Sequence, residues 1–370
     1  MTEAEGLSDW LRLSLTDGVG TQTARDLLNR FGLPEQVFSA GFAALQKCVP
    51  DKLARMLSAA PSESIAAQIK LSLAWARQPG NQVLTLADHD YPPSLLSIAD
   101  PPPLLYVKGR MDLLSRPSVA IVGSRSATQQ GLQNAARFAQ ALSDAGLTVI
   151  SGLALGIDGS AHEGALSPNP TQGSTVAITG TGMDLVYPAK HRALAHRIAI
   201  DGCLVSEYPL GTPAMAANFP RRNRLISGLS QGVLVVEAAL QSGSLITAKS
   251  ALEQGREVFA IPGSIHSPLA KGCHQLIRQG AKLVESAQDI LEELRWQLPS
   301  ISDHQVHSAA TPKHSESDAL LEAAGYDPVS VDDLAERTRL PLMAIHAGLL
   351  ALEMQGQIEM LAGGMYRRLR

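Results

Sequence analysis

The sequence predicts an α/β protein: a Rossmann-like, doubly wound parallel sheet between an N-terminal helical domain and a C-terminal winged-helix domain. Three observations support this prediction: the chain length, the alternation of strand-like and helix-like segments in the middle of the chain, and a separate small module at its end. At 370 residues the chain exceeds one ordinary domain. With 45% hydrophobic and 18% charged residues, it can bury substantial cores.

The composition changes at two places along the chain. Near Pro79-Gly80-Asn81, alanine-rich helical sequence gives way to a strand-like segment at 83–86. Residues 297–316 are polar and lack helical or strand periodicity, which is typical of a linker. We therefore predict a helical domain over residues 1–80, a Rossmann-like domain over 81–296, a linker over 297–316 and a winged-helix domain over 317–370.

The N-terminal segment contains a helix-hairpin-helix pattern, of the kind found in SAM-like helical domains. Gly18-Val19-Gly20 forms a turn, and the following helix carries Ala24 and Leu27 on one side. Glycines permit a tight turn that exposes amide N–H groups and a helix N-terminus, where a phosphate could bind. The turn could equally be a packed connection that binds nothing. The sequence leaves both interpretations open.

Short, nearly all-apolar segments alternate with helical ones through the middle of the chain. The predicted strands are 119–122, 148–151, 175–178, 204–206, 232–236, 258–261 and 282–284. The predicted helices that follow them are 128–145, 158–165, 191–200, 222–229, 245–254, 272–279 and 287–294. Such alternation indicates a parallel sheet that is covered by helices on both faces.

The last segment fits a winged helix. Three helices are predicted at 318–324, 331–337 and 342–355, and two strands flank Gly363-Gly364. The third helix contains no lysine or arginine, whereas a helix that reads a DNA groove normally brings cations and polar side chains. We therefore expect this module to contact protein rather than to read duplex DNA.

Charge and cysteine content exclude several classes of protein. Against 35 acidic residues the chain has 31 basic ones, a net charge of −4, so any polyanion site must be a local patch. No apolar run reaches the length of a membrane span, and the acidic start lacks a signal-sequence pattern. The three cysteines are scattered, without metal-ligand spacing or an even number for disulfides. We expect a cytoplasmic protein with no membrane association, no metal and no cofactor.

Small and polar residues gather where the predicted strands end. Gly123-Ser124-Arg125 follows the first core strand and Ser151-Gly152-Leu153-Ala154 the second, while Ser242-Gly243-Ser244 opens a later helix. Ligands of open α/β sheets bind outside the carboxyl ends of the strands. Small residues allow a close approach to the backbone, and exposed amides at helix starts favour an anion.

A cationic segment, which we take as a loop, precedes the predicted helix at 222–229. It reads Asn218-Phe219-Pro220-Arg221-Arg222-Asn223-Arg224. Arginine pairs with phosphate in a bidentate manner, and an aromatic ring accepts an unpaired base. Cations near the positive end of a helix dipole are unfavourable unless an anion binds there. The segment therefore predicts a nucleic-acid or phosphate site.

Other candidate residues are weaker. Lys190 and His191 follow the Tyr187-Pro188 turn and could extend the patch, although His191 fits an ordinary helix start. We interpret His162 as a hydrogen-bonded structural residue and Cys273 as inert, because neither has an evident catalytic partner in the sequence. Glu237 would serve as the general base of an enzyme; otherwise it would orient the backbone or an arginine such as Arg224.

Two familiar nucleotide-binding motifs are missing from the sequence. No G-x-x-x-x-G-K-[ST] motif occurs, which argues against a P-loop motor. The first core strand does not lead into G-x-G-x-x-G, and no acidic residue follows at the expected position, which argues against NAD chemistry.

Taken in order, these segments resemble the DNA-processing protein A family, DprA or Smf. The segments that carry the resemblance are GSR at 123–125, SGLALGIDGSAH at 151–162, the Tyr187-Pro188 turn and the run from SEYPLG to AIPG at 206–263. The resemblance implies that residues 81–296 form a DNA-binding domain and that the protein binds single-stranded DNA without being an enzyme. It also implies a homodimer that forms through the Rossmann core, protects incoming strands and loads RecA recombinase onto them in natural transformation, with single-strand-binding protein as a further partner.

The resemblance also suggests roles for individual residues. Arg125 would hold a phosphate, and Phe219, Arg222 and Arg224 would grip the backbone and pack against a base. The whole implied nucleic-acid-binding set is Gly123, Ser124, Arg125, Lys190, Phe219, Arg221, Arg222, Asn223, Arg224 and Lys249. No catalytic residue is implied.

An enzyme is the alternative hypothesis. The central fold is similar to the lysine-decarboxylase-like phosphoribohydrolases, which use a P-G-G-x-G-T-x-x-E signature. The nearest sequence here is Pro262-Gly263-Ser264-Ile265-His266, which lacks the rest of that signature. We therefore favour binding over hydrolysis of nucleotides.

Overall fold

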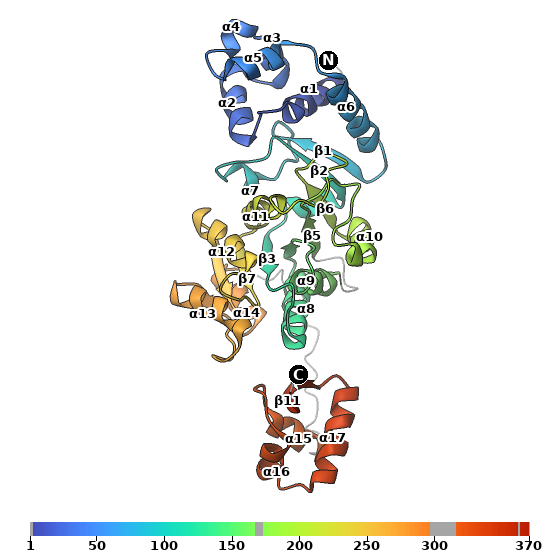
Figure 1. The fold of residues 1–370 in the computed structure, drawn as a ribbon, viewed down its shortest axis with the longest axis vertical. Helices are drawn as coiled ribbons and strands as arrows, with labels where there is room; N and C mark the ends of the chain where they lie inside the picture. Colours follow the sequence, from blue (N-terminus) through green and yellow to red (C-terminus); the bar gives the residue numbers. More distant parts are fainter. Residues whose placement is uncertain (1–2, 167–172, 297–315, 362, 370) are drawn as a thin grey trace. The chain divides into compact units, whose positions relative to one another are not determined.

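The computed structural model describes residues 3–166, 173–296, 316–361 and 363–369 (Figure 1). It divides into two compact units, one formed by residues 1–127 and 134–297, the other by residues 128–133 and 298–370. Residues 297–315 of the predicted linker lie outside the described part of the chain.

A nine-stranded sheet forms the centre of the first unit, in the order β1-β2-β6-β5-β4-β3-β7-β8-β9. The strands are β1 (Asn81–Thr85), β2 (Leu104–Gly109), β3 (Ser118–Val122), β4 (Thr148–Ser151), β5 (Ser174–Ile178), β6 (Cys203–Ser206), β7 (Gly232–Val235), β8 (Glu257–Ala260) and β9 (Lys282–Leu283). Strands β3 to β9 are parallel, as predicted. An antiparallel β1–β2 pair extends the β6 edge, and β2 was not predicted.

Helices cover both faces of this sheet, because successive strand residues point to opposite sides. On one face, Ala120 and Val122 of β3 pack with α11 (Asn218–Leu229), α12 (Gly243–Glu253) and α13 (Lys271–Arg278). On the other, Val119 and Ile121 pack with α8 (Gln129–Asp144), α9 (Ile157–Ala165) and α14 (Ala287–Glu293). Also at the sheet, α10 (Arg192–Asp201) packs against β5 and β6. The Rossmann-like prediction is thus confirmed, with an antiparallel edge added.

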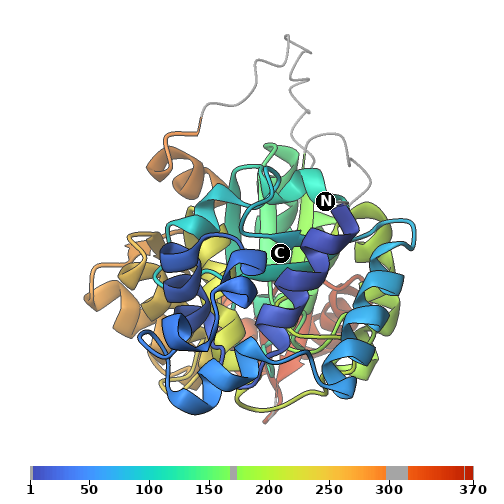
Figure 2. The same ribbon diagram turned by 90° about the horizontal axis from the view of Figure 1, so that it is seen from above.

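The N-terminal helices belong to the same unit (Figure 2). They are α1 (Glu3–Leu15), α2 (Thr21–Phe31), α3 (Pro34–Ser39), α4 (Phe42–Leu45), α5 (Asp51–Ser58) and α6 (Glu63–Ala76). Leu13, Leu27 and Leu57 are among the side chains of their shared core. Between α1 and α2, the turn contains Gly18 at φ +87°, a conformation that favours glycine. Trp75 at the end of α6 packs edge-on against Tyr106 of β2, with ring centroids 5.6 Å apart.

The second unit contains a winged helix, as predicted. Its elements are α15 (Glu316–Ala324), α16 (Val331–Thr338), α17 (Leu342–Met354), β10 (Ile358–Leu361) and β11 (Met365–Arg368). Leu334, Ile345 and Leu349 lie in its own hydrophobic core. Met343, Leu350 and Met354 are exposed on the opposite side of α17.

Residues 218–224 are helical rather than a loop, which corrects the prediction. The helix α11 begins at Asn218, so Pro220 falls in its first turn. Proline is tolerated there because the N–H groups of a first helical turn have no partner within the helix. The direction in which each arginine of the segment points is therefore set by the helical repeat.

Candidate functional site

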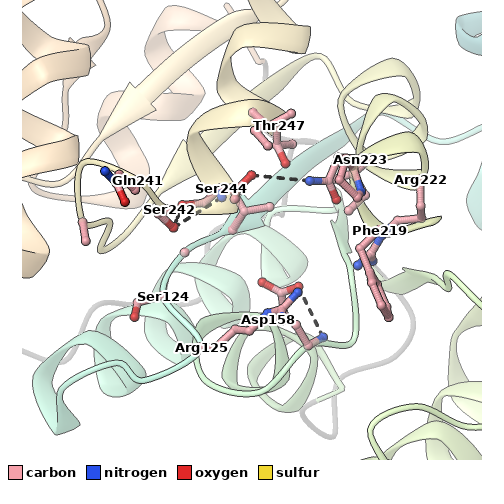
Figure 3. A pocket seen from close by; sticks show the side chains of 18 of the residues that line it. Ser124, Arg125, Asp158, Phe219, Arg222, Asn223, Gln241, Ser242, Ser244 and Thr247 are labelled. Carbon is pink, nitrogen blue, oxygen red and sulfur yellow. Dashed lines mark hydrogen bonds between the residues drawn. The ribbon is translucent and has the colours of Figure 1, made fainter. Parts of the chain in front are cut away.

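The sheet reverses its direction of winding between β3 and β7. From β3 the chain proceeds to β4, β5 and β6 on one side and later to β7, β8 and β9 on the other. Ligands of such sheets bind where the order reverses. A pocket of about 810 Å³ lies at this point, and residues that follow β3, β4 and β7 line it together with α11 and α12 (Figure 3).

The segment after β3 forms one wall of the pocket. A Cβ on Gly123 would lie 2.6 Å from Ile157 Cγ1 and 2.9 Å from the Glu237 carbonyl oxygen, so the close packing here requires glycine. The Ser124 N–H donates to the same carbonyl at 2.8 Å. Arg125 is exposed, and its guanidinium lies 5.7 Å from the centroid of the Phe219 ring. The wall therefore carries a cation over an aromatic ring at the solvent edge.

A second aromatic ring lies beside Phe219. Tyr187 also lines the pocket, and its ring centroid is 5.5 Å from that of Phe219, with the planes tilted by 39°. The two rings and the Arg125 side chain form an aromatic and cationic rim. Bases of any sequence can stack on such a surface.

Arg222 lies on the inner side of the pocket. Only 3% of it is exposed, and its Nη1 donates to the Ile178 carbonyl oxygen at 2.5 Å. Burial lowers the pKa of the Arg222 guanidinium to about 10, while the neighbouring Asp158 carboxylate opposes this shift. The group therefore remains charged at neutral pH. Within the described residues its Nε is buried without a hydrogen-bond partner.

The loop between β4 and α9 positions Asp158 beside Arg222. The Asp158 Oδ2 atom accepts hydrogen bonds from the N–H groups of Gly152, at 3.1 Å, and Ala154, at 3.3 Å. Burial raises the pKa of the Asp158 carboxyl, whereas Arg222 and these N–H groups lower it. A Cβ on Gly152 would lie 2.1 Å from Arg222 Nη1 and 2.7 Å from Asp158 Oδ2. Glycine is therefore needed for both side chains to meet here.

The N-terminus of α12 forms the opposite wall. The Ser242 side chain caps this helix by accepting from the Ser244 N–H, and the two hydroxyls are 2.7 Å apart. On the adjacent helix α11, Asn223 Nδ2 donates to the Gly243 carbonyl oxygen at 3.4 Å. Hydroxyl and amide groups near the positive end of a helix dipole complement an anion. Both the wall and the inner arginine thus favour a negatively charged ligand.

The structure brings six of the ten predicted binding residues together. Gly123, Ser124, Arg125, Phe219, Arg222 and Asn223 line the pocket. The other four do not. Arg221 and Lys190 are exposed outside the lining, and Lys249 on α12 is exposed with its Nζ 3.7 Å from Glu253 Oε1.

Arg224 differs most from its predicted place. Only 11% of its side chain is exposed; its Nη2 pairs with Glu207, and its Nε lies 3.0 Å from Asp100 Oδ2. Residues two apart on a helix point in widely different directions, so Arg222 and Arg224 cannot share one wall. The prediction that Arg224 lines the site is therefore wrong. This arginine neutralises Glu207. Burial raises the pKa of the Glu207 carboxyl, although the neighbouring Arg224 lowers it.

His162 and Cys273 have the structural roles predicted from the sequence. His162 Nε2 accepts from the Leu153 N–H at 3.3 Å, and Nδ1 lies 2.7 Å from the Thr175 hydroxyl. That hydroxyl donates to the Val149 carbonyl oxygen at 2.7 Å, so Nδ1 is the donor to Thr175. Burial lowers the pKa of His162 to about 3 and raises that of the buried Cys273 thiol to about 12.

Sequence reasoning missed the pocket roles of Asp158, Gln241 and Thr247. Each follows the end of a core strand or lies in the first turns of the next helix, which is the signal that could have identified them. No group of three or more metal-ligating side chains occurs among the described residues. In the same part of the chain, no helix is long and apolar enough to cross a membrane.

Fold and site define a Rossmann-like protein with a cationic, aromatic-edged pocket at the switch point of its sheet, joined to a winged helix. The chain belongs to the DNA recombination-mediator protein A family, whose model matches residues 82–295. The model of the DprA winged helix domain matches residues 306–364.

Relatives and solved structures agree with this assignment. Protein Smf of Escherichia coli K12 is 44% identical over 307 residues, which cover 82% of this chain and 81% of the relative. The X-ray structure of DNA processing protein A from Streptococcus pneumoniae has a TM-score of 0.62 and 38% identity, covering 79% of this chain and 98% of that one. A structure of the Helicobacter pylori protein, described for its single-stranded DNA binding mode, has a TM-score of 0.52 and 30% identity, covering 58% of this chain and 96% of that one.

Proposed function

We propose that this protein binds single-stranded DNA in the pocket at the switch point and acts there as a recombination mediator. The observation that carries the proposal is the pairing of an inner arginine, Arg222, with an exposed cation and ring, Arg125 and Phe219, in one pocket. Cations bind the phosphates, and the rings accept unpaired bases whatever their sequence. The described binding mode of the Helicobacter pylori relative supports the same ligand.

Fluorescence anisotropy with labelled oligothymidine tests this proposal directly. Wild-type protein should bind, with an affinity that falls with salt by about 0.7 log units per log unit of salt for each neutralised phosphate. Arg125→Ala should weaken this binding. Its matched control is Arg197→Ala, since this arginine lies on α10 outside the pocket and pairs with Glu163. Failure of the wild-type protein to bind would overturn the proposal.

The finer activity that we propose is the loading of RecA onto single strands that enter the cell in natural transformation, within the cytoplasm. The family description, a recombination-mediator protein, supports this part. A strand-exchange assay with RecA and single-strand-binding protein should show faster joint-molecule formation when this chain is added. Equal rates with and without it would leave a DNA-binding protein that does not mediate.

We further propose that the protein holds its strand without cleaving it, and that it works as a homodimer. Asp158, an acid in the pocket, is engaged by two backbone N–H groups and lies beside Arg222, an arrangement suited to positioning. Oligonucleotides should be recovered intact by mass spectrometry after prolonged incubation. Light scattering on the purified chain should give twice the monomer mass of 39.2 kDa.

For the winged-helix unit we propose a protein contact rather than DNA readout. The exposed side of α17 offers Met343, Leu350 and Met354 and has no lysine or arginine. Flexible methionines suit adaptable protein contacts, whereas a helix in a DNA groove needs cations and base-reading groups.

A further inference from the structure

A second groove lies next to the pocket, between α10 and the end of α6. Its volume is about 620 Å³, and both of its sides belong to the first unit. The residues that line it are Trp75, Gln78, Lys108, Met183, Asp184, Leu185, Val186, Arg192, Ala195, His196, Ala199 and Leu204. None of these residues lines the pocket at the switch point.

One segment of chain separates the two depressions. Tyr187 lines the pocket, while its neighbours Leu185 and Val186 line the groove, and so does Arg192 a few residues later. Lys190 lies between them and is exposed. The groove therefore begins within a few residues of the aromatic rim, and a cation lies on the segment between them.

The groove is cationic. The side chains of Lys108, at the end of β2, and Arg192, in the first turn of α10, have no hydrogen-bond or ion-pair partner in the described part of the chain. His196 lies one helical turn after Arg192, on the same face of α10. The acidic lining residue is Asp184, whose Oδ1 and Oδ2 atoms accept from the Gly211 N–H at 2.8 Å and 3.0 Å. Two cations, the exposed Arg192 and the half-buried Lys108, thus lie beside one carboxylate that already has a partner.

The inner surface of the groove is apolar and fixed in place. Trp75 is buried and held edge-on against Tyr106, and Met183, Ala195 and Leu204 lie beside it. An apolar surface bordered by cations suits the sugar and phosphate of a nucleic-acid backbone. Because the groove starts beside the pocket, the polyanion that reaches it most directly is the strand that already occupies the pocket.

We propose that a single strand held in the pocket continues over Tyr187 and Lys190 into this groove, where Lys108 and Arg192 bind its phosphates. This inference rests on the proposed function. It predicts a binding site longer than the pocket alone, in which affinity increases with oligonucleotide length until the strand reaches the groove.

The test compares wild-type protein with the double variant Lys108→Gln/Arg192→Gln on oligothymidines of increasing length. The shortest oligomers, confined to the pocket, should bind both proteins equally. For long oligomers the variant should lose about 25-fold in affinity at 0.1 M salt, and its salt slope should fall by about 1.4, since each single-strand phosphate contact contributes about 0.7. The matched control is Lys70→Gln/Arg197→Gln, which removes the same charge from α6 and α10 outside both depressions.

The outcomes separate this inference from the proposed function. One outcome is that the variant and the control bind long oligomers as tightly as the wild type, while Arg125→Ala weakens binding at every length. The proposed strand path through the groove is then wrong, and the proposed binding in the pocket is retained. If the wild type binds no oligomer at all, the proposed function fails, and the groove fails with it. Circular dichroism of each variant verifies that the fold is retained, as expected for side chains at the surface.

Discussion

At the scale of single residues, the arginines of the 218–224 segment divide into different roles. Arg222 is buried and turned into the pocket, whereas Arg224 is buried in an ion pair with Glu207. Identical side chains two positions apart therefore line the pocket in one case and form an ion pair within the fold in the other. For the same reason, the exposed Arg125 at the pocket rim and the ion-paired Arg224 lead to opposite predictions.

Arg125→Ala should weaken single-strand binding with little effect on stability, because this side chain is exposed at the rim of the pocket. We expect about a five-fold loss of affinity at 0.1 M salt and a salt slope smaller by about 0.7, the contribution of one phosphate. Anisotropy titrations at several salt concentrations measure both. Unchanged affinity and slope would remove Arg125 from the site.

Arg224→Ala should instead destabilise the protein, by about 3–5 kcal/mol, because it leaves the carboxylate of Glu207 buried without its partner. Glu207 is 7% exposed at its side chain, so water cannot replace the arginine. Urea denaturation measures the loss in the free energy of unfolding, and adding Glu207→Gln should recover part of it. Full stability of Arg224→Ala would contradict the structural role.

His162 should make stability depend on pH. Its pKa is about 3 in the folded protein against 6.5 when unfolded, so the unfolded chain takes up a proton first as the pH falls. This contribution to stability is complete above pH 6.5 and declines as the pH falls towards about 3. Between pH 7 and pH 5 it should amount to about 2 kcal/mol, and His162→Asn should reduce the pH dependence of urea unfolding by that amount. An unchanged dependence would contradict a buried neutral imidazole.

At the scale of elements, the loop between β4 and α9 determines where Arg222 can lie. Gly152→Ala would bring a methyl group to 2.1 Å from Arg222 Nη1 and 2.6 Å from its Cζ, so the guanidinium would have to move. We expect lower single-strand affinity together with a loss of about 1–3 kcal/mol in stability, as for other overpacked sites. Gly6→Ala on α1 is the control, since a Cβ there meets nothing within 4 Å.

The elements also show what the sequence could predict. The core strands could be predicted because each is a short apolar run that leads through small residues into a helix. This pattern is local, so it can be recognised without knowing which distant segments pack against it. Strand β2 was missed because its apolar run is no different from other short buried segments until its antiparallel partners β1 and β6 are known. The start of α11 was missed because Pro220 resembles a helix break, although the first turn accepts proline.

The pocket could be predicted only in part, for the same reason. Gly123, Ser124 and Arg125 follow a strand directly, so their place at the sheet edge follows from the topology of the sheet. The direction of Arg224 and the burial of Glu207 depend on the exact phase of α11 against β6 and the N-terminal part of the unit. Such contacts between distant segments cannot be read from local sequence.

At the scale of the whole molecule, removing residues 310–370 should leave most of the single-strand affinity intact. The winged helix has its own hydrophobic core, and the residues that line the pocket and the groove all lie before residue 248. Residues 310–370 carry 6 basic and 9 acidic residues, so their removal takes away little positive charge. A large loss of affinity in the truncated chain would show that this module contacts the strand.

The reversal of the sheet at β3 has a consequence for the newly made protein. Walls of the pocket come from residues near 123 and from residues as late as Thr247, which are synthesised far apart in time. A nascent chain that has emerged only as far as β6 has the lining residues that follow β3, β4 and β5, but lacks those of α11 and α12. We therefore expect single strands to bind only once the whole sheet has formed, and a bound oligonucleotide should slow the unfolding of both halves of the sheet together.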